Sequence, residues 1–570
     1  MTRIGYHPGT HLQNNVTQFL ERHLARDAAQ VALSWVDPQA MRSWGFDPAT
    51  ELPHLSVTME RFCGDIARTA AGMTELGLQK GDRAILFVPM SLELYTAMFA
   101  LVRIGAIPVF LDSWARRGHL GVSARCVEPK AMISFQGAFQ LVGGVPELAE
   151  IPIKIAVGPT TMAFSGRIEE LRETPRMAPI EPVEQEHTAL VTFTTGSSGE
   201  PKGANRTHRF LAAQHYALDE CLPYTIRDID LPAFPIFSLN NIASGVTTVI
   251  PAVDLGAPKK NDALILYAQL VSAKATCTTL SPSMLNGISA YCIEQGLKLG
   301  GLRRVVTGGA PVSRDNLVDF TKIAPNAEVW VLYGSTEVEP MAHIEAQEMI
   351  NFRSREADDP EWVDNGVNVG HFADGLRHRF IQIRKGPVMI RSEVDWEDLE
   401  VGPGEVGELI VCGEHVCRDY YNNTEAFRRA KIVDEAGDVW HRTGDLARLD
   451  EQGNLWMVGR VHNAINRAGH YEFPVRAEVV MKKLPFVKQC AYLGLHHAEL
   501  GEETCCAVVA HPNAPSVEGM EAEVRRIMAK NGIVVDRVVF PLEIPMDARH
   551  HSKVEYDLLR EQLVAQGLVG

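Results

Sequence analysis

Residues 84–111 have the sequence AILFVPMSLELYTAMFALVRIGAIPVFL. This stretch is the most hydrophobic in the chain, but Pro89, Glu93, Arg103 and Pro108 interrupt it, which argues against a membrane span. The interruptions leave two short apolar runs with a helical pattern between them. The stretch therefore predicts a strand–helix–strand unit, and the chain is expected to have an α/β fold.

Capping and turn residues set the boundaries of this unit. We expect strands over Ala84–Val88 and Ile107–Leu111, with a helix over Leu92–Ile104 between them. Ser91 stands directly before the helix and is a favoured N-cap residue, and Gly105 follows the helix. Together these signals predict a βαβ unit.

The pattern continues on both sides of this unit. A helical pattern covers Met59–Glu75, and helices alternate with short apolar strands as far as about Val312, which favours a mostly parallel sheet. From about Gly402 the glycines are closely spaced and the strands short, and Asp450–Gly453 is expected to be a hairpin turn. We therefore expect a β-rich subdomain over about 370–459.

The last hundred or so residues have a pattern of their own. Strands are expected near Cys490–Leu495 and Cys505–Ala510, and a helix over Glu518–Lys530. These elements predict a small α+β domain. The expected domains are thus residues 1–459 and residues 460–570, joined by a hinge of few residues because no Pro/Gly/Ser-rich linker separates them.

Composition restricts the class of protein. The chain has 570 residues, of which 46% are hydrophobic and 22% charged, as is typical of globular proteins. Its net charge of −16 argues against a nucleic-acid partner. The ten cysteines form no Cys-x-x-Cys pair, and the polar residues after Met1 lead us to expect no signal peptide. We expect a reduced, cytoplasmic protein with no transmembrane segment.

A second stretch, Thr194–Gly203, has the sequence TTGSSGEPKG. Its glycines let backbone N–H groups point at an anion, while its hydroxyls and the Lys202 ammonium add further donors. It is not a Walker A loop, because Pro201 rather than glycine precedes the lysine. Alone, such a stretch is more often a solvated turn, so the other motifs of the chain must decide its role.

Further motifs follow in order: Gly308-Gly309-Ala310-Pro311, Tyr333-Gly334-Ser335-Thr336-Glu337, Arg442-Thr443-Gly444-Asp445, Gly459-Arg460 and a terminal Lys553. Singly, each has a structural explanation: Tyr333 as strand core, Glu337 as a helix cap or Asp445 as a turn residue. In this order they resemble the adenylate-forming superfamily of acyl-CoA synthetases, peptide-synthetase adenylation domains and luciferases. The resemblance covers nearly the whole chain.

The resemblance implies a fold and a reaction. The fold is a large N-terminal domain of two α/β sheets plus a β-barrel-like part, followed by a small, mobile α+β domain. The reaction is attack of a carboxylate on the α-phosphate of ATP, which gives an acyl-adenylate and pyrophosphate, with Mg²⁺ as cofactor. Of the residues, Lys202, Thr336, Glu337 and Lys553 would be catalytic.

Position by position, the resemblance implies these contacts: the β- and γ-phosphates with Thr194, Thr195, Gly196, Ser197, Ser198, Gly199 and Lys202; the adenine with Gly308, Gly309, Ala310, Pro311 and Tyr333, beside Gly334 and Ser335; the α-phosphate with Thr336; Mg²⁺ with Glu337; the ribose with Asp445 and Arg460; and the developing charge at the carboxylate and α-phosphate with Lys553.

Three details resemble the β-lactone synthetases of bacterial olefin biosynthesis. They are the Arg-His-x-Ser-Lys ending at Lys553, the segment Asn205-Arg206-Thr207-His208, and Phe234-Pro235-Ile236-Phe237 without a following histidine. That subfamily implies a long-chain β-hydroxy acid whose own hydroxyl attacks the adenylated carbonyl, expels AMP and closes a lactone. Its acyl pocket would include Phe234, Phe237, Ser238, Asn240 and Gly245.

Two other functions stay open. A fatty-acyl-CoA synthetase or fatty-acyl-AMP ligase would pass the acyl group to coenzyme A or to an acyl carrier, in company with other enzymes of a lipid pathway. An inactive nucleotide-binding protein is the third candidate. His208, His215, His550 and His551 are candidates for a catalytic base or for purely structural roles.

Overall fold

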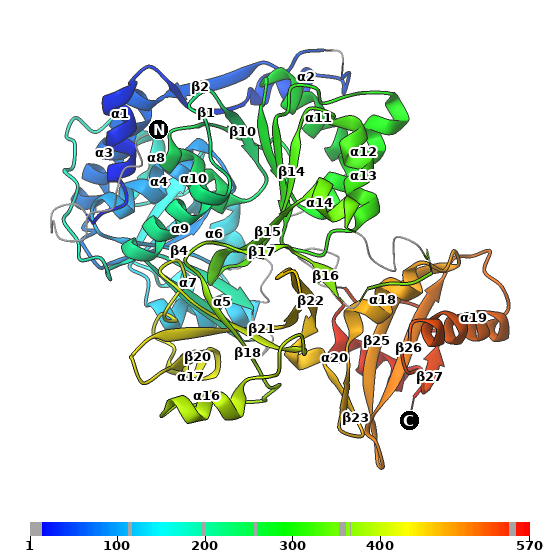
Figure 1. Ribbon diagram of the computed structural model, residues 1–570. Coiled ribbons are helices and arrows are strands. Elements are labelled where there is room, and N and C mark those ends of the chain that lie inside the picture. Colours follow the sequence, from blue (N-terminus) through cyan, green and yellow to red (C-terminus); the bar gives the residue numbers. More distant parts are fainter. Residues whose placement is uncertain are drawn as a thin grey trace. The chain divides into compact units, whose positions relative to one another are not determined.

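The computed structural model describes residues 14–48, 50–111, 117–195, 200–255, 259–352, 359, 361–364, 366–546 and 554–569. The chain forms two compact units (Figure 1). The first comprises Met1–Ala346, Ala373–Leu376 and Gly413–Arg428, and the second Gln347–Phe372, Arg377–Cys412 and Arg429–Gly570. The expected boundary at residues 459 and 460 stays a prediction.

The expected strand–helix–strand unit is present in the first unit. β3 (Arg83–Phe87) and β4 (Ile107–Phe110) are parallel neighbours, and α4 (Leu92–Arg103) connects them. Ser91 caps the helix, since its hydroxyl accepts a hydrogen bond from the backbone N–H of Leu94 at 3.2 Å. Gly105, with φ at 71°, allows the chain to turn from the helix into β4.

Two sheets form the first unit. The order in the first is β7 (Gly166–Arg167), β6 (Ile153–Val157), β5 (Ala131–Phe135), β3, β4, β8 (Thr188–Thr195) and β9 (Pro201–Thr207). In the second it is β15 (Val338–Glu345), β14 (Glu328–Ser335), β13 (Arg304–Gly308), β12 (Cys277–Leu280), β10 (Ile229–Pro232), β11 (Thr247–Ile250), β1 (Val31–Val36) and β2 (His54–Thr58). Neighbours are parallel except β8 with β9, β14 with β15 and β1 with β2. The predicted pair of mostly parallel α/β sheets is confirmed.

Helices alternate with these strands. They are α1 (Gln18–Arg26), α2 (Pro38–Ser43), α3 (Met59–Glu75), α4, α5 (Arg117–Val127), α6 (Gln136–Val142), α7 (Pro146–Ala149), α8 (Ile168–Leu171), α9 (His208–Cys221), α10 (Pro235–Ser244), α11 (Asp262–Ser272), α12 (Pro282–Gln295), α13 (Arg314–Ile323), α14 (Ala346–Asn351) and α17 (Thr424–Ala430). The helix predicted over Met59–Glu75 is confirmed at both ends.

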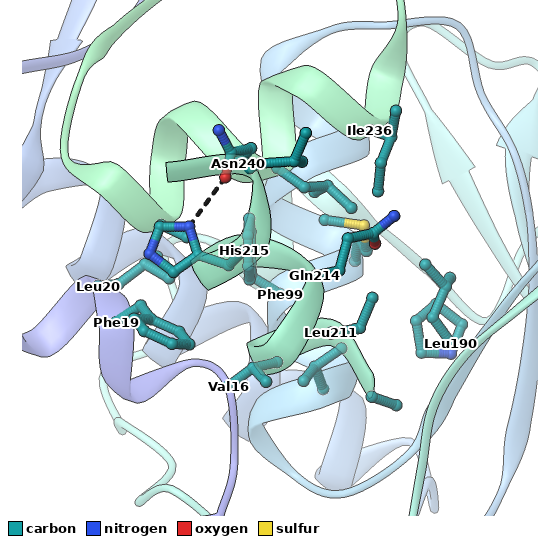
Figure 2. Close-up of a pocket in the computed structure, with 17 residues that line it drawn as sticks. Val16, Phe19, Leu20, Phe99, Leu190, Leu211, Gln214, His215, Ile236 and Asn240 are labelled. Atoms are coloured by element: carbon teal, nitrogen blue, oxygen red, sulfur yellow. Dashed lines mark hydrogen bonds between the residues drawn. The ribbon is translucent and has the colours of Figure 1, made fainter. Parts of the chain in front are cut away.

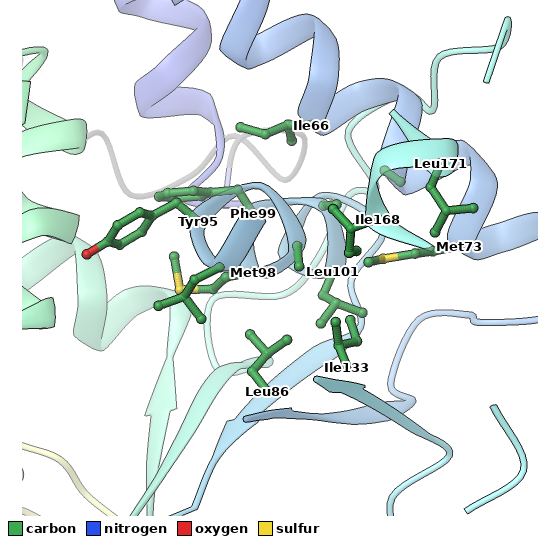
Figure 3. Packing of buried hydrophobic residues seen from close by; sticks show 14 of the residues in the cluster. Ile66, Met73, Leu86, Tyr95, Met98, Phe99, Leu101, Ile133, Ile168 and Leu171 are labelled. Carbon is green, nitrogen blue, oxygen red and sulfur yellow. The ribbon is translucent and has the colours of Figure 1, made fainter. Parts of the chain in front are cut away.

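Both faces of the first sheet are covered. Leu86 of β3 packs in a cluster with Met98 of α4 and Ile66 of α3 (Figure 3). The next residue along the strand, Ile85, packs in a separate cluster with Leu120 of α5. Because successive strand residues point to opposite faces, helices lie on both sides of this sheet.

The second unit contains an antiparallel sheet where the β-rich subdomain is expected. Its order is β16 (Val367–Asn368), β22 (Leu455–Arg460), β21 (Val439–Leu449), β19 (Gly407–Cys412) and β18 (Arg377–Ile381), with β20 (Lys431–Val433) also paired to β21. α16 (Glu393–Leu399) follows β18, and β17 is His371–Phe372. The predicted turn at Asp450–Gly453 joins β21 to β22 and is confirmed.

A further sheet of the second unit contains β24 (His470–Glu472), β23 (Ile465–Arg467), β26 (Gly501–Ala510) and β25 (Val487–His497), and β27 (Arg537–Val539) pairs with β26. The single turn η1 (Val461–Asn463) precedes β23. α18 (Pro474–Lys482) and α19 (Val517–Lys530) pack on one face, and α20 (Tyr556–Ala565) on the other. The α+β character expected for this end of the chain is confirmed.

The described part of the chain contains no helix with the length and apolar character needed to cross a bilayer. All ten cysteines are free thiols. The cytoplasmic location stays a prediction.

Replacing Ser91 by alanine tests the helix cap. Ser91→Ala removes the acceptor for the Leu94 N–H and should lower the stability of the first unit by about 1 kcal/mol. Ser91→Asp keeps an acceptor and should restore most of that loss. Thermal unfolding of the three proteins measures the effect, and identical melting temperatures for wild type and Ser91→Ala would contradict it.

The stability of the second unit should depend on pH, because the unit contains a buried carboxyl group. Glu478 of α18 accepts hydrogen bonds from the Tyr556 hydroxyl at 2.6 Å and from the Tyr492 N–H at 3.2 Å. Burial raises the pKa of Glu478 from 4.5 to about 7. The folded protein therefore binds the proton more tightly than the unfolded chain, and this group makes stability fall as the pH rises from about 4.5 to about 7.

Glu478→Gln should remove that contribution, which amounts to about 3 kcal/mol over the window. Melting temperatures measured from pH 4.5 to 8 should therefore fall less steeply for the variant than for the wild type. The exposed Glu425→Gln is the matched control and should leave the profile unchanged. Parallel profiles for wild type and Glu478→Gln would exclude this role for the carboxyl.

Candidate active site

The glycine-rich stretch is a β-hairpin at the edge of the first sheet. β8 and β9 pair antiparallel, with Thr194 opposite Lys202. Gly196, Ser197, Ser198 and Gly199, predicted to bind phosphate, lie outside the described residues, as does the side chain of Thr195. The two described members, Thr194 and Lys202, thus stand opposite each other where the strands lead into the turn.

Lys202 lies beside Glu337, the residue predicted to bind Mg²⁺. Its ammonium is 3.9 Å from Oε1 of Glu337 and 3.3 Å from the hydroxyl oxygen of Tyr420. The Tyr420 hydroxyl in turn donates to the same Oε1 at 2.7 Å. Glu337 is only 7% exposed. The structure therefore brings together two of the predicted catalytic residues and adds a tyrosine that sequence reasoning missed.

The segment before α17 holds Tyr420 in place through its backbone. The N–H of Cys417 donates to the carbonyl of Glu337 at 2.7 Å, and that of Tyr421 to the carbonyl of Gly203 at 2.8 Å. Tyr420 itself forms a β-bridge with Ala204 of β9. The segment thus ties the β14–β15 turn to the strand that carries Lys202, and it delivers a buried hydroxyl between them.

Arg206 supports the same turn from β9. Its side chain donates to the carbonyl oxygen of Thr336 at 2.8 Å, next to Glu337. It also faces Glu339, whose pKa burial raises to about 7 while the charge of Arg206 lowers it. Arg206 belongs to the segment that resembles the β-lactone synthetases. In the structure it fixes the backbone of Thr336, the residue predicted to contact the α-phosphate.

The predicted adenine motif lies at the carboxyl end of β13. A Cβ at Gly308 would lie 2.2 Å from the carbonyl oxygen of Leu332 in β14, so only glycine fits there. Gly309 has φ at 80°, and Ala310 and Pro311 follow. The motif therefore lies against the strand that contains Tyr333.

The motif that begins with Tyr333 starts at the end of β14. Tyr333 pairs with Ala342 of β15 and is half-buried, and Gly334 and Ser335 complete the strand. The Ser335 hydroxyl is buried and has no hydrogen-bond partner among the described residues. Such a group fits a ligand that supplies the missing hydrogen bond.

Asp445 and Arg460, predicted to bind the ribose, lie side by side in the second unit. They are paired residues of β21 and β22, and Nε of Arg460 is 2.7 Å from Oδ1 of Asp445. Arg442 of the same motif was not predicted as a site residue. It forms a buried ion pair with Glu408 at 2.6 Å, which anchors β21 to β19.

The expected acyl-pocket residues belong to α10 and its two ends. Phe234 and Phe237 pack against Leu332 and Val306 of the second sheet. Ser238 is fully buried. Gly245 ends the helix with φ at 69°. Asn240 also belongs to α10 and lines a cavity beside α9 (Figure 2).

The two candidate histidines that the structure describes, His208 and His215, each have a hydrogen-bond partner. Nδ1 of His208 accepts from the N–H of Val16 at 3.1 Å, and burial lowers the pKa of His208 to about 3. Nδ1 of His215 lies 2.8 Å from Oδ1 of Asn240, and burial lowers its pKa too. Both are therefore neutral near pH 7. The other candidates, His550 and His551, lie with Lys553 outside the described residues.

Glu337 fits a magnesium ion that is shared with a phosphate. Mg²⁺ prefers carboxylate oxygens and usually keeps one or two protein carboxylates together with phosphates and water. Among the described residues, no group of three His, Cys, Asp or Glu side chains could hold a metal. A magnesium ion at Glu337 would thus need oxygens from a bound nucleotide.

Comparison with known proteins decides the family. The family model described as AMP-binding enzyme matches residues 48–421. The chain belongs to the AMP-binding enzyme family. The matched range includes the glycine-rich hairpin, Gly308, Glu337 and Tyr420. The resemblance to adenylate-forming enzymes is therefore confirmed, and the chain is an AMP-forming acid ligase.

Individual relatives agree with this assignment. The chain is 28% identical over 498 residues to an olefin beta-lactone synthetase of Stenotrophomonas maltophilia, covering 85% of this chain and 87% of the relative. It is 23% identical over 500 residues to a long-chain-fatty-acid–CoA ligase of Mycobacterium tuberculosis, covering 87% of this chain and 91% of that ligase. The ATP-bound crystal structure of MatB from Rhodopseudomonas palustris matches with a TM-score of 0.74 at 20% identity, covering 96% of this chain and 99% of that one. The predicted fold class is confirmed.

Removing the Tyr420 hydroxyl should weaken this AMP-binding enzyme. Tyr420→Phe leaves Glu337 without its 2.7 Å donor, so the carboxylate loses its fixed orientation beside Lys202. We expect ATP–pyrophosphate exchange to fall by about tenfold, which corresponds to one lost hydrogen bond to a charged group. The Mg²⁺ concentration for half-maximal exchange should rise.

Tyr421→Phe is the matched control, because Tyr421 is the next residue and is only half-buried. It should retain wild-type exchange. Equal activity of Tyr420→Phe and wild type at all Mg²⁺ concentrations would show that the hydroxyl does not position Glu337.

Proposed function

We propose that this AMP-binding enzyme adenylates a long-chain β-hydroxy acid and converts it into a β-lactone. The observation that carries the proposal is the 28% identity to two olefin beta-lactone synthetases, each over 85% of this chain. The three sequence details at Lys553, Arg206 and Phe237 support the same subfamily. A small-molecule acid is thus the substrate, and ATP supplies the activating group.

The first step joins the acid to the α-phosphate. A carboxylate oxygen forms a bond to the α-phosphorus while the bond from that phosphorus to pyrophosphate breaks. We assign Lys202 and the hairpin to the β- and γ-phosphates, where the ammonium compensates negative charge. Glu337 would hold Mg²⁺, which neutralises phosphate charge when bound. Tyr420 and Arg206 keep Glu337 and Thr336 in place.

The nucleoside contacts are assigned by motif. Gly308, Gly309, Ala310 and Pro311 with Tyr333 would contact the adenine, and the unpaired Ser335 hydroxyl lies in the same motif. Asp445 would accept from the ribose hydroxyls. Its 2.7 Å contact with Arg460 orients the carboxylate for this role.

The second step needs no further substrate. The β-hydroxyl oxygen forms a bond to the carbonyl carbon, the bond from that carbon to the AMP oxygen breaks, and AMP departs with the electron pair. The hydroxyl proton passes to a base or to solvent. The new ring contains the carbonyl carbon, two chain carbons and the former hydroxyl oxygen. Proximity within one molecule replaces coenzyme A.

Lys553 should be essential for the first step. We propose that it belongs to a mobile domain of residues 460–570 and bridges the carboxylate and α-phosphate. Lys553→Ala should abolish ATP–pyrophosphate exchange with little change in melting temperature. Lys488→Ala, at an exposed position of β25, is the control and should keep full activity. Full exchange by Lys553→Ala would refute the assignment.

The products distinguish the proposal from its main alternative. The enzyme is incubated with ATP, Mg²⁺ and matched fatty and β-hydroxy fatty acids, with and without coenzyme A, and the products are identified by mass spectrometry. A β-lactone formed from the β-hydroxy acid without coenzyme A supports the proposal. A thioester formed only with coenzyme A overturns it.

The alternative is a fatty-acyl-CoA synthetase or fatty-acyl-AMP ligase. The similarity to a long-chain-fatty-acid–CoA ligase at 23% identity favours it. In that case coenzyme A or an acyl carrier of a lipid pathway would be the second partner, and the fatty acid without a hydroxyl would be a full substrate.

A further inference from the structure

A short segment before β16 contacts the part of the second unit that contains β23 to β27 with α18, α19 and α20. We call this part the C-terminal module, and we call the segment, which consists of Asp359 and residues 361–364, the strap. Both belong to the second unit. The antiparallel sheet lies between them in the sequence, so their contact is a long-range one.

Val363 anchors the strap in the hydrophobic core of the C-terminal module. Its side chain is 4% exposed and belongs to a cluster whose other described members come from residues 465–533. Among them are Ile465 of β23, Ala477 of α18 and Ile527 of α19. Burial of apolar side chains is the main favourable contribution to such packing. Departure of the strap would therefore expose part of the core of the module to water.

A buried amide binds the backbone of the strap at two points. Oδ1 of Asn531 accepts from the N–H of Val363 at 2.9 Å, and Nδ2 of Asn531 donates to the carbonyl of Glu361 at 2.8 Å. Asn531 is 1% exposed and follows α19 directly. Its amide thus pairs with the strap much as the backbone of a neighbouring strand would. Because Asn531 is buried, breaking these bonds without replacing them is costly.

Cations of α18 and α19 add further contacts. Arg476 of α18 donates to the carbonyl of Val363 at 2.9 Å. Arg526 and Lys530 of α19 each form an ion pair with Glu361 at 2.7 Å. The two ion pairs are partly exposed, so each contributes little alone. Together with the buried valine and the buried amide, they give the strap three different kinds of contact with the module.

The strap is joined to β16 by a very short connection. Gly366 packs against β22, since a Cβ there would lie 2.8 Å from the carbonyl oxygen of Met457. Gly366 is three positions after Val363, and a chain of that length spans at most about 11 Å. While Val363 stays buried, the core of the module therefore stays within this distance of β22 at this point.

The C-terminal module has a second, covalent connection to the same strand. β22 leads through the single turn η1 into β23. A hinge of few residues alone would let the module turn in many directions. Two short attachments allow fewer movements, because each movement must preserve both lengths. The strap thus restricts the module to pivoting next to β22.

We infer that the strap is a permanent second attachment of the C-terminal module, and that strap and module move as one body whenever the enzyme changes state. The inference rests on the proposed mobility of residues 460–570, but it depends on no assignment of the acid. Its consequence for catalysis is that the module pivots at β22 and does not swing free between the two steps.

Hydrogen exchange of the full-length protein, followed by mass spectrometry, tests the inference. The amide of Val363 should be protected without ligand and should stay protected with ATP and Mg²⁺ and with AMP. Glu361→Arg reverses a charge that faces two cations and should speed this exchange about tenfold. Glu435→Arg, at an exposed turn, is the matched control and should leave the exchange unchanged.

Two results of this experiment overturn the inference. One is exchange at Val363 as fast as in an unfolded chain when no ligand is present. The other is loss of protection on addition of either nucleotide. An enzyme that forms no acyl-adenylate but keeps Val363 protected would refute the proposed function and still support the strap, so the two failures are distinguishable.

Cutting the covalent connection tests whether the strap retains the C-terminal module. A protease recognition sequence is inserted after the exposed His462 of η1, and the purified full-length protein is cleaved there. The two fragments should co-elute in size-exclusion chromatography at micromolar concentration. Val363→Asp places a carboxylate in an apolar core and should make them separate. Val517→Asp, at the exposed start of α19, is the control and should not.

Melting temperatures of the uncleaved proteins show which variants are folded. Glu361→Arg changes only a partly exposed side chain, so it tests the strap even where Val363→Asp does not fold. It should raise the apparent dissociation constant of the fragments about tenfold. Separation of the fragments with an unchanged strap, or equal affinity in wild type and Glu361→Arg, overturns the inference.

Discussion

The burial of one carboxylate, that of Glu337, organises the described part of the candidate site. A buried charge is tolerated only with close partners, and Glu337 has a tyrosine hydroxyl at 2.7 Å and a lysine ammonium at 3.9 Å from the same oxygen. These partners come from β9 and from the segment before α17, so the carboxylate ties together strands that are distant in the chain. We propose that the same carboxylate and ammonium contact Mg²⁺ and phosphate when a nucleotide is bound.

The parts of the fold that depend on short-range signals could be predicted from the sequence. Ser91 and Gly105 bound α4 because capping and left-handed turns are local properties, and the hairpin at Asp450–Gly453 is equally local. The motifs around Gly308 and Glu337 could be located because their residue types and order are specific to the family that the chain matches. For Gly308 the structure adds a physical reason, since a side chain there would collide with Leu332.

Other features depend on contacts between distant residues and leave no pattern in the sequence. Tyr420 is 83 positions from Glu337, and nothing in its neighbourhood distinguishes it from a buried core tyrosine. The partner of Asn240 is His215, which belongs to a different helix. The ion pair of Arg442 with Glu408 joins strands whose pairing only the folded sheet defines. Substrate choice depends on such long-range packing, whereas use of ATP follows from the family.

The central claim is that the acid is activated at the α-phosphate of ATP. The most direct measurement uses a substrate acid labelled with ¹⁸O in its carboxyl group, followed by mass spectrometry of the nucleotide products. Attack of the carboxylate on the α-phosphorus, followed by loss of AMP from the carbonyl carbon, transfers one labelled oxygen to AMP. The account predicts labelled AMP and unlabelled pyrophosphate. Label in inorganic phosphate, with ADP as the nucleotide product, would contradict it.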